Sequence, residues 1–191
     1  HHKQINSVFT YEIIEEKEKG TGCASDSGFR HSINKYQAKY LARTDADCLV
    51  DFNWIQSIRK NLVAKGLDFI GGSIKIRSDD ILLSYFQRIL IPVLLFLADL
   101  YAPFKFGFKG YKYIFFIVAG NNLAINANTY LKSGGFPRSS IHTTDEDTVL
   151  VQRVRKITSK AKRCRDMIVY QSARRLQLYG YKNIILWYND R

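Results

Sequence analysis

Hydrophobic residues recur along the first part of the chain with periods that alternate between those of strands and helices. Strands are predicted for residues 7–14 and 40–44. Between them, residues 25–40 have the pattern of a helix, with Ser25 or Asp26 as its N-cap. The order strand, helix, strand is the first indication of an α/β protein.

The pattern continues with a second helix and a glycine-containing strand. Asp51 is placed to cap a helix whose apolar residues recur at helical spacing over residues 54–62, before Gly66 ends it. Residues 67–77 predict a strand in which a glycine pair indicates a bulge or a close backbone approach. Alternation at this spacing is typical of a parallel sheet, in which ligand groups gather at the carboxyl ends of the strands.

The second half of the chain also alternates between predicted strands and helices. Residues 121–137 predict a strand, a short helix and a glycine turn. A helix is expected to begin at Asp145, capped by Thr143 or Thr144. A last strand is predicted within residues 165–173.

One apolar segment, residues 81–101, raises the question of a membrane. Its uninterrupted part, residues 89–98, is too short to span a bilayer and contains Pro92, so we expect a buried or interfacial helix. Aromatic residues and lysines interleave in residues 101–116, a composition that suits a lipid headgroup layer or stacking on bases. An apolar helix with a lid loop packed on the sheet accounts for the same pattern equally well.

Composition narrows the class of protein. A chain of 191 residues with 46% hydrophobic content is long enough to bury the core of one domain. The net charge is +12, and residues 148–191 hold eleven Lys or Arg against two Asp, which favours an anionic partner. Three cysteines without a paired spacing predict free thiols in a reducing, cytoplasmic compartment.

Two acidic clusters are candidates for chemistry. Asp45 and Asp47 follow a predicted strand, where their carboxylates are suited to bind Mg²⁺ or Mn²⁺ bridging to a diphosphate. Glu146 and Asp147 open a helix, where acids also complement the helix dipole as a plain cap. A carboxylate there is equally placed to act as a general base toward an acceptor hydroxyl.

Glycine turns and an arginine pair complete the candidate residues. Backbone without side chains at the two glycine turns would let a sugar or phosphate approach closely. The arginines follow the last predicted strand, where they would bind a diphosphate or simply begin a basic helix. The residues concerned are Gly120, Asn121, Asn122, Gly134, Gly135, Arg174 and Arg175.

Together, these segments resemble the family 2 glycosyltransferases of the GT-A fold over residues 19–175. The matching stretches, in order, are GTGCASDSGFRHSI, YLARTDADCLVDFNWI, FIGGSIKI, AGNNLAINANTYLKSGGF, TTDEDTVLVQRVRK and SARR. The resemblance implies a GT-A-like, Rossmann-related, mixed but mainly parallel sheet flanked by helices. It also implies metal-assisted, inverting transfer of a hexose from a nucleotide-diphosphate sugar to a saccharide or lipid-linked acceptor.

The resemblance assigns roles to residues. It implies that Asp45 and Asp47 form the DxD motif, with Asp47 the more direct metal ligand. It implies that Asp147 is the catalytic base, with Glu146 as the competing assignment. The remaining implied contacts are Gly120, Asn121 and Asn122 with the donor sugar, Gly134 and Gly135 with the acceptor, and Arg174 and Arg175 with the leaving diphosphate.

The chain departs from the family in two places. Residues 24–28 read ASDSG where the family usually has an arginine that contacts the donor. The two opening strands that hold the nucleotide base have no counterpart, so we expect a partial domain over residues 1–175 that binds donor weakly or not at all. Residues 81–118 are expected to be an insertion and residues 176–191 a helical extension.

Two other classes of function stay open at this point. A nucleotidyltransferase also binds a nucleotide diphosphate through paired aspartates, whereas a non-catalytic basic module would bind nucleic acid through residues 148–191. The second leaves both acidic clusters unexplained, and for the glycosyltransferase no nucleic-acid partner is expected. Peripheral contact with an anionic membrane, at its inner face, is compatible with the apolar segment.

Overall fold

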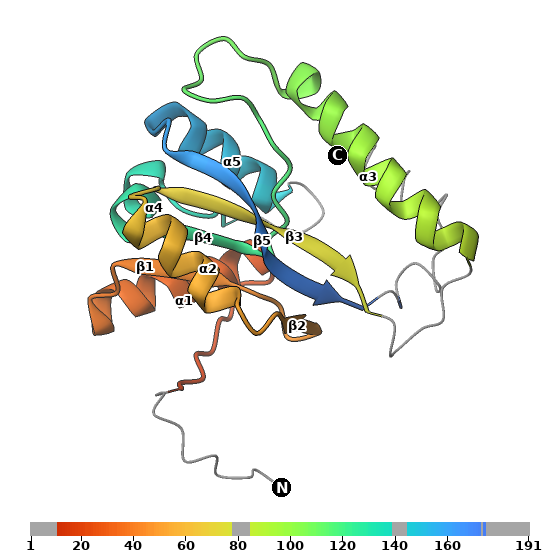
Figure 1. The fold of residues 1–191 in the computed structure, drawn as a ribbon. Helices are drawn as coiled ribbons and strands as arrows, with labels where there is room; N and C mark the ends of the chain where they lie inside the picture. Colours follow the sequence, from red (N-terminus) through yellow and green to blue (C-terminus); the bar gives the residue numbers. More distant parts are fainter. Residues whose placement is uncertain (1–10, 78–84, 139–144, 173, 175–191) are drawn as a thin grey trace, which may run out of the picture.

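The computed structural model describes residues 11–77, 85–138, 145–172 and 174, and these residues form an α/β structure (Figure 1). Five strands make one sheet in the order β1-β4-β3-β5-β2. The strands are β1 (Tyr40–Arg43), β2 (Cys48–Val50), β3 (Phe69–Ile76), β4 (Leu123–Asn126) and β5 (Ala161–Gln171). The α/β class is therefore confirmed.

The directions of the strands differ from the prediction. Only β3 and β5 pair in parallel, and the three other neighbouring pairs are antiparallel, so the expected mainly parallel sheet is wrong. After the long connection from β3, β4 begins beside Gly71 and runs antiparallel to the first three residues of β3. Hydrophobic periodicity predicts which segments are strands but contains no information on their direction.

Helices cover both faces of the sheet. They are α1 (Thr21–Tyr36), α2 (Trp54–Ile58) with its π-helical continuation η1 (Arg59–Ala64), α3 (Tyr85–Phe106), α4 (Ala127–Ser133) and α5 (Glu146–Ile157). Successive strand residues alternate between two cores. Phe69 and Ile125 pack with α1, α4 and α5, whereas Ile70 and Ala124 pack with α2 and η1.

The first helix begins earlier than predicted. It starts at Thr21, after Gly20, so that the expected N-caps Ser25 and Asp26 lie inside it. Asp26 is buried, and its carboxylate accepts hydrogen bonds from Arg30 and from the hydroxyl of Tyr130. These tertiary partners replace the capping role. Residues 11–14 form no strand, and the rest of the strand predicted for residues 7–14 lies outside the described residues.

The predicted glycine irregularity in β3 is confirmed. The pairing with β5 shifts between Gly72 and Ser73, from Cys164 to Ile168, so three residues of β5 form a bulge. The backbone also passes close to a neighbour, because a Cβ atom on Gly72 would lie 2.2 Å from Nδ2 of Asn122. Both alternatives offered for this glycine pair therefore apply.

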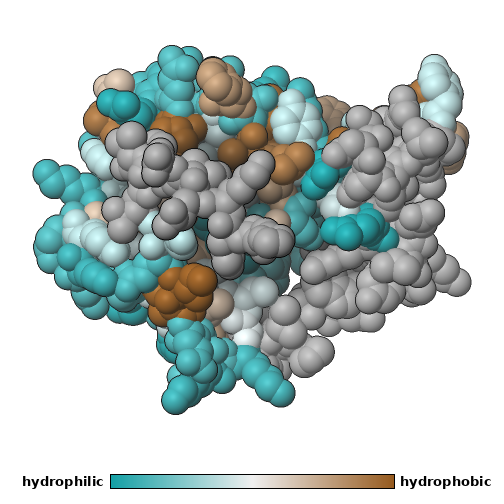
Figure 2. All heavy atoms as spheres, turned by 90° about the horizontal axis from the view of Figure 1, so that it is seen from below, coloured by the Kyte–Doolittle hydropathy of each residue, from teal (hydrophilic) through white to brown (hydrophobic). Residues whose placement is uncertain are grey.

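The long helix α3 lies at one side of the sheet rather than inside the protein (Figure 1). Among its described side chains, most large hydrophobic ones are exposed, so a buried helix is excluded and the interfacial alternative stays a prediction. None of the helices built from described residues has the length and hydropathy needed to cross a membrane. Seen from below, the described surface shows separate hydrophobic patches among hydrophilic residues (Figure 2).

A buried arginine ties the segment after α3 to α5. Arg155, on α5, has no exposed surface and donates hydrogen bonds to the carbonyl oxygens of Phe106 (3.3 Å), Gly107 (2.7 Å) and Tyr113 (3.1 Å). Its guanidinium carbon lies 3.9 Å from the centroid of the Tyr111 ring. The loop that follows α3 is thus fixed to the far end of α5.

Candidate active site

The strand pairings bring distant polar segments to one end of the sheet. Arg43, the last residue of β1, lies opposite Leu123, the first residue of β4. Because the two strands are antiparallel, the turn after β1 and the turn before β4 leave the sheet at the same end. Residues 44–47 and 120–122 are therefore neighbours, as the prediction of a site at the strand ends requires.

Arg43 lies between the two acidic clusters. Its Nε is 3.3 Å from Oδ1 of Asp45, and its Nη1 is 3.4 Å from Oδ1 of Asp147 and 3.7 Å from Oε1 of Glu146. The Arg43 side chain is only 11% exposed, and its guanidinium lies 5.4 Å from the ring centroid of Phe136. Carboxylates about a hundred residues apart in sequence thus share one cation, which offsets their mutual repulsion.

The sequence analysis missed Arg43. A signal was present, because Arg43 is the last strand residue before the acidic pair in the stretch YLARTDAD. A cation at that position is what two adjacent carboxylates need if they are to be partly buried. Arg43 lies within residues 40–44, which were predicted as a strand, so its side chain was not considered for the site.

Asp147 is held by the backbone of the turn before β4. It lies in the first turn of α5, and its Oδ2 accepts a hydrogen bond from the N–H of Gly120 at 2.7 Å. A Cβ atom on Gly120 would lie 2.2 Å from Oδ1 of Asp147. The glycine is thus required for this close approach, and the two predicted site residues are in direct contact.

The environment of Asp147 changes its acidity. Burial raises the pKa of its carboxyl group to about 7, against the opposing effect of Arg43, while the neighbouring charge of Glu146 raises it further. A carboxylate with a pKa near 7 accepts protons far better than an ordinary aspartate and is still substantially ionised at neutral pH. The acid–base property expected of a general base is therefore present at this position.

Glu146 has a different set of partners. Its Oε1 accepts a hydrogen bond from the hydroxyl of Thr21, at the start of α1, and faces Arg43. The Glu146 side chain is 13% exposed. The contact joins the first turns of α1 and α5, so Glu146 has a positioning role whether or not it takes part in chemistry.

Asp45 and Asp47 lie in the turn between β1 and β2. Asp45 is 43% exposed, and the exposed Asp47 has its Oδ1 3.5 Å from the Sγ of Cys48. Within the described ranges, no group of three or more His, Cys, Asp or Glu is arranged to hold a metal ion. Two carboxylates suit Mg²⁺ only where the substrate's phosphates supply further oxygen ligands, which is a common arrangement for this ion.

The two asparagines before β4 have opposite environments. Asn122 is fully buried, accepts a hydrogen bond from Nε1 of Trp54 at 2.9 Å, and donates to the carbonyl oxygens of Ser73 and Met167. Asn121 is 6% exposed and donates to the Sγ of Cys48, but its Oδ1 has no hydrogen-bond partner among the described residues. Asn122 therefore holds the turn in place, whereas Asn121 retains an unused acceptor.

Gly134 and Gly135 end α4 with positive φ angles of 82° and 70°. The carbonyl oxygen of Gly135 accepts a hydrogen bond from Arg153 on α5 at 2.8 Å. A Cβ atom on Gly135 would lie 2.8 Å from both Asp26 and Tyr130. The glycine turn is thus explained by packing and helix termination, and any contact with an acceptor stays a prediction.

Arg174 leaves the sheet near the acidic turn. The pairing of Cys48 with Gln171 means that residues 45–47 and Ser172 extend from the same end of β2 and β5. Arg174 is exposed, and its backbone N–H and its Nε both donate hydrogen bonds to the hydroxyl of Ser172. Arg175 lies outside the described residues.

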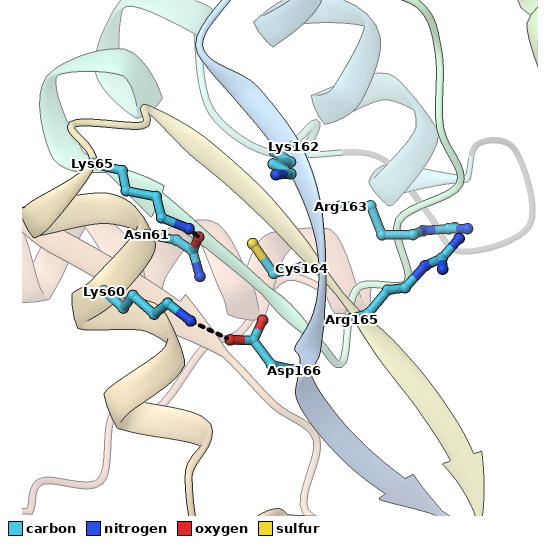
Figure 3. Close-up of a pocket in the computed structure, with 8 residues that line it drawn as sticks. All are labelled: Lys60, Asn61, Lys65, Lys162, Arg163, Cys164, Arg165 and Asp166. Atoms are coloured by element: carbon cyan, nitrogen blue, oxygen red, sulfur yellow. Dashed lines mark hydrogen bonds and ion pairs between the residues drawn. The ribbon is translucent and has the colours of Figure 1, made fainter.

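A basic pocket of about 450 Å³ lies elsewhere, between η1 and β5 (Figure 3). Its cations do not converge: Lys60 pairs with Asp166 at 3.5 Å, and Arg163 and Arg165 lie across the strand from Lys60 and Lys65. None of the predicted site residues is part of this pocket. Its lining consists of Lys60, Asn61, Lys65, Lys162, Arg163, Cys164, Arg165 and Asp166.

No family model matches this chain, and no curated protein matches it in sequence. The assignment of function therefore depends on the site itself. In that site, Asp45, Glu146 and Asp147 meet at Arg43, and Gly120 binds Asp147 directly.

Proposed function

We propose that the chain forms the catalytic part of an inverting glycosyltransferase, which moves a sugar from a nucleotide-diphosphate sugar to an acceptor hydroxyl. The observation that supports this most strongly is the partly buried Asp147, 20% exposed, whose pKa is raised to about 7 and which shares Arg43 with Asp45. A proton acceptor beside a carboxylate suited to an ion and diphosphate is the combination that sugar transfer needs.

Asp147 is the proposed base. As it takes the proton of the acceptor hydroxyl, the hydroxyl oxygen forms a bond to the anomeric carbon on the face opposite the diphosphate. The bond from that carbon to the diphosphate oxygen breaks, and its electron pair leaves with the diphosphate. The hydrogen bond from Gly120 to Oδ2 holds the carboxylate in one orientation during this step.

The exposed residues of the site are proposed to bind the donor. Asp45 and Asp47 would hold Mg²⁺ or Mn²⁺, which when bound neutralises charge on the diphosphate. Arg174, with Arg175, would contact the same leaving group. Gly120 and Asn121 would border the donor sugar through the turn before β4, while Asn122 keeps that turn in position.

Product analysis tests this proposal. With a panel of nucleotide-diphosphate sugars and Mg²⁺ or Mn²⁺, the protein is expected to release a nucleoside diphosphate. Asp147→Asn should lower the initial rate about 10²- to 10⁴-fold, because the proton acceptor is lost. Asp166→Asn, which removes an acid remote from the site, is the matched control.

Three outcomes would contradict the proposal. Release of pyrophosphate would indicate nucleotidyl transfer. An active Asp147→Asn variant would show that Asp147 is not the base. A folded protein that turns over none of the donors would remove the assignment as a whole.

A further inference from the structure

One face of α3 carries a continuous row of exposed hydrophobic side chains. Their positions are three or four residues apart, which places them along one side of the helix. Each is between 46% and 76% exposed. This outer face of α3 consists of Phe86, Ile89, Val93, Leu97, Leu100, Tyr101 and Phe104.

The opposite side of α3 is attached to the rest of the protein. The carboxylate of Asp99 pairs with the guanidinium of Arg163 on β5, with 2.9 Å between Oδ1 and Nη2. Ala102 is buried, and the ring of Phe106 stacks on Phe115 with 4.2 Å between centroids. The C-terminal part of the helix, residues 99–106, is thus held against the protein, and the described residues leave its outer face uncovered.

The charges around the outer face are positive. Lys105 and Lys109 are exposed beside the exposed rings of Phe104 and Phe108. Between residues 85 and 118 the only acid in the sequence is Asp99, and that carboxylate is taken up by Arg163. Within residues 85–118, the apolar face therefore ends in cations and aromatic rings.

We propose that the outer face of α3, with Lys105 and Lys109, docks on the headgroup region of an anionic lipid membrane. A helix of this kind lies in the plane of the interface, with its apolar side chains at the acyl boundary and its cations near the lipid phosphates. A second copy of the chain is disfavoured as the occupant, because it would bring a further net charge of +12 to a positive surface. The proposal does not depend on the glycosyltransferase assignment.

Vesicle flotation of the full chain tests this docking. Binding to vesicles of equal parts phosphatidylcholine and phosphatidylglycerol is expected to exceed binding to phosphatidylcholine alone. The double variant Lys105→Glu/Lys109→Glu should weaken binding to the anionic vesicles at least about tenfold, since each lysine contributes about 1 kcal/mol near such a surface. Leu97→Asp/Leu100→Asp should weaken binding to both kinds of vesicle.

Matched controls lie elsewhere on the surface. Lys132→Glu/Lys156→Glu changes the net charge by the same amount at exposed lysines on α4 and α5. Phe52→Asp removes a fully exposed aromatic side chain before α2. The leucine variant and Phe52→Asp should both keep the wild-type rate of nucleoside diphosphate release with a water-soluble acceptor, so that loss of docking and loss of catalysis are distinguishable.

Four results would overturn the proposal. The first is flotation of the wild-type protein with anionic vesicles no better than with neutral ones, and the second is flotation of the α3 variants as good as that of the controls. A change in the monomer–dimer equilibrium without a change in flotation would show that the face joins two copies. A lower unfolding midpoint in the leucine variant alone would show that another part of the chain covers the face.

Discussion

The two halves of the candidate site place the same functional group in opposite environments. In the buried half, Asp147 contacts Gly120 next to the fully bonded Asn122, and its pKa is raised to about 7. In the exposed half, Asp45 and Asp47 lie in an open turn. The comparison indicates that the fold holds the proposed proton acceptor in position in advance, whereas the proposed ion-binding carboxylates are left for a ligand to organise.

The largest expected effect is on the stability of the buried half. Asn122→Leu should lower the free energy of unfolding by about 3–5 kcal/mol, because Trp54 Nε1 and two backbone carbonyls lose their partner in the core. Asn121→Leu should be nearly neutral, because it removes an acceptor that is already unpaired. Urea unfolding of both variants measures this difference. Equal losses would mean that the two asparagines are not distinguished as described.

A pH effect of on the order of 2–4 kcal/mol is expected from Asp147. Between its ordinary pKa of 3.8 and about 7, the folded protein binds more protons than the unfolded chain. Stability contributed at this position therefore falls as the pH rises from about 4 to 7. Asp147→Asn lacks this loss, so the variant should gain stability relative to wild type over that range. Parallel pH profiles in urea unfolding would contradict the raised pKa.

A smaller effect is expected from crowding the contact between Gly120 and Asp147. Gly120→Ala adds a methyl group that overlaps the carboxylate of Asp147, so either the Asp147 side chain or the turn before β4 has to move aside. The free energy of unfolding should therefore fall by about 1–3 kcal/mol. Gly28→Ala in α1, where a Cβ atom meets nothing within 4 Å, is the control. Chemical denaturation of the two variants compares them. A neutral Gly120→Ala would indicate a looser contact than the structure shows.

The exposed half should show almost no effect on stability. Asp47→Asn is expected to change the free energy of unfolding by no more than about 0.5 kcal/mol, because the side chain is exposed. Its effect should appear instead as a weaker dependence of donor turnover on Mg²⁺ or Mn²⁺. A strongly destabilised Asp47→Asn protein would remove the distinction between the two halves.

Local sequence patterns predicted most of the elements around the site. β1, β4, α4 and the glycine turn after it were found from alternation, capping and turn residues, because these signals act within a few positions along the chain. The meeting of the two acidic clusters was expected from a family resemblance, and in the structure Asp45 and Asp147 do contact the same arginine.

Other features depend on contacts that no local pattern records. Strand direction follows from where each connection returns to the sheet, so the antiparallel pairs could not be read from periodicity. The start of α1 at Thr21 coincides with a contact to Glu146, 125 positions away. Arg43, at the end of β1, and Arg155, on α5, are charged residues whose type alone suggests exposure, yet both are largely or fully buried.

Helix α5 fixes the distance between Asp147 and the loop that Arg155 holds. Arg155 grips the loop after α3, and Asp147 lies eight positions earlier on the same helix, which corresponds to about 12 Å of axial rise. Because α5 is one continuous helix, the proposed base and the loop after α3 are held at this separation. A change that loosens the grip of Arg155 on the loop would therefore also disturb the position of Asp147.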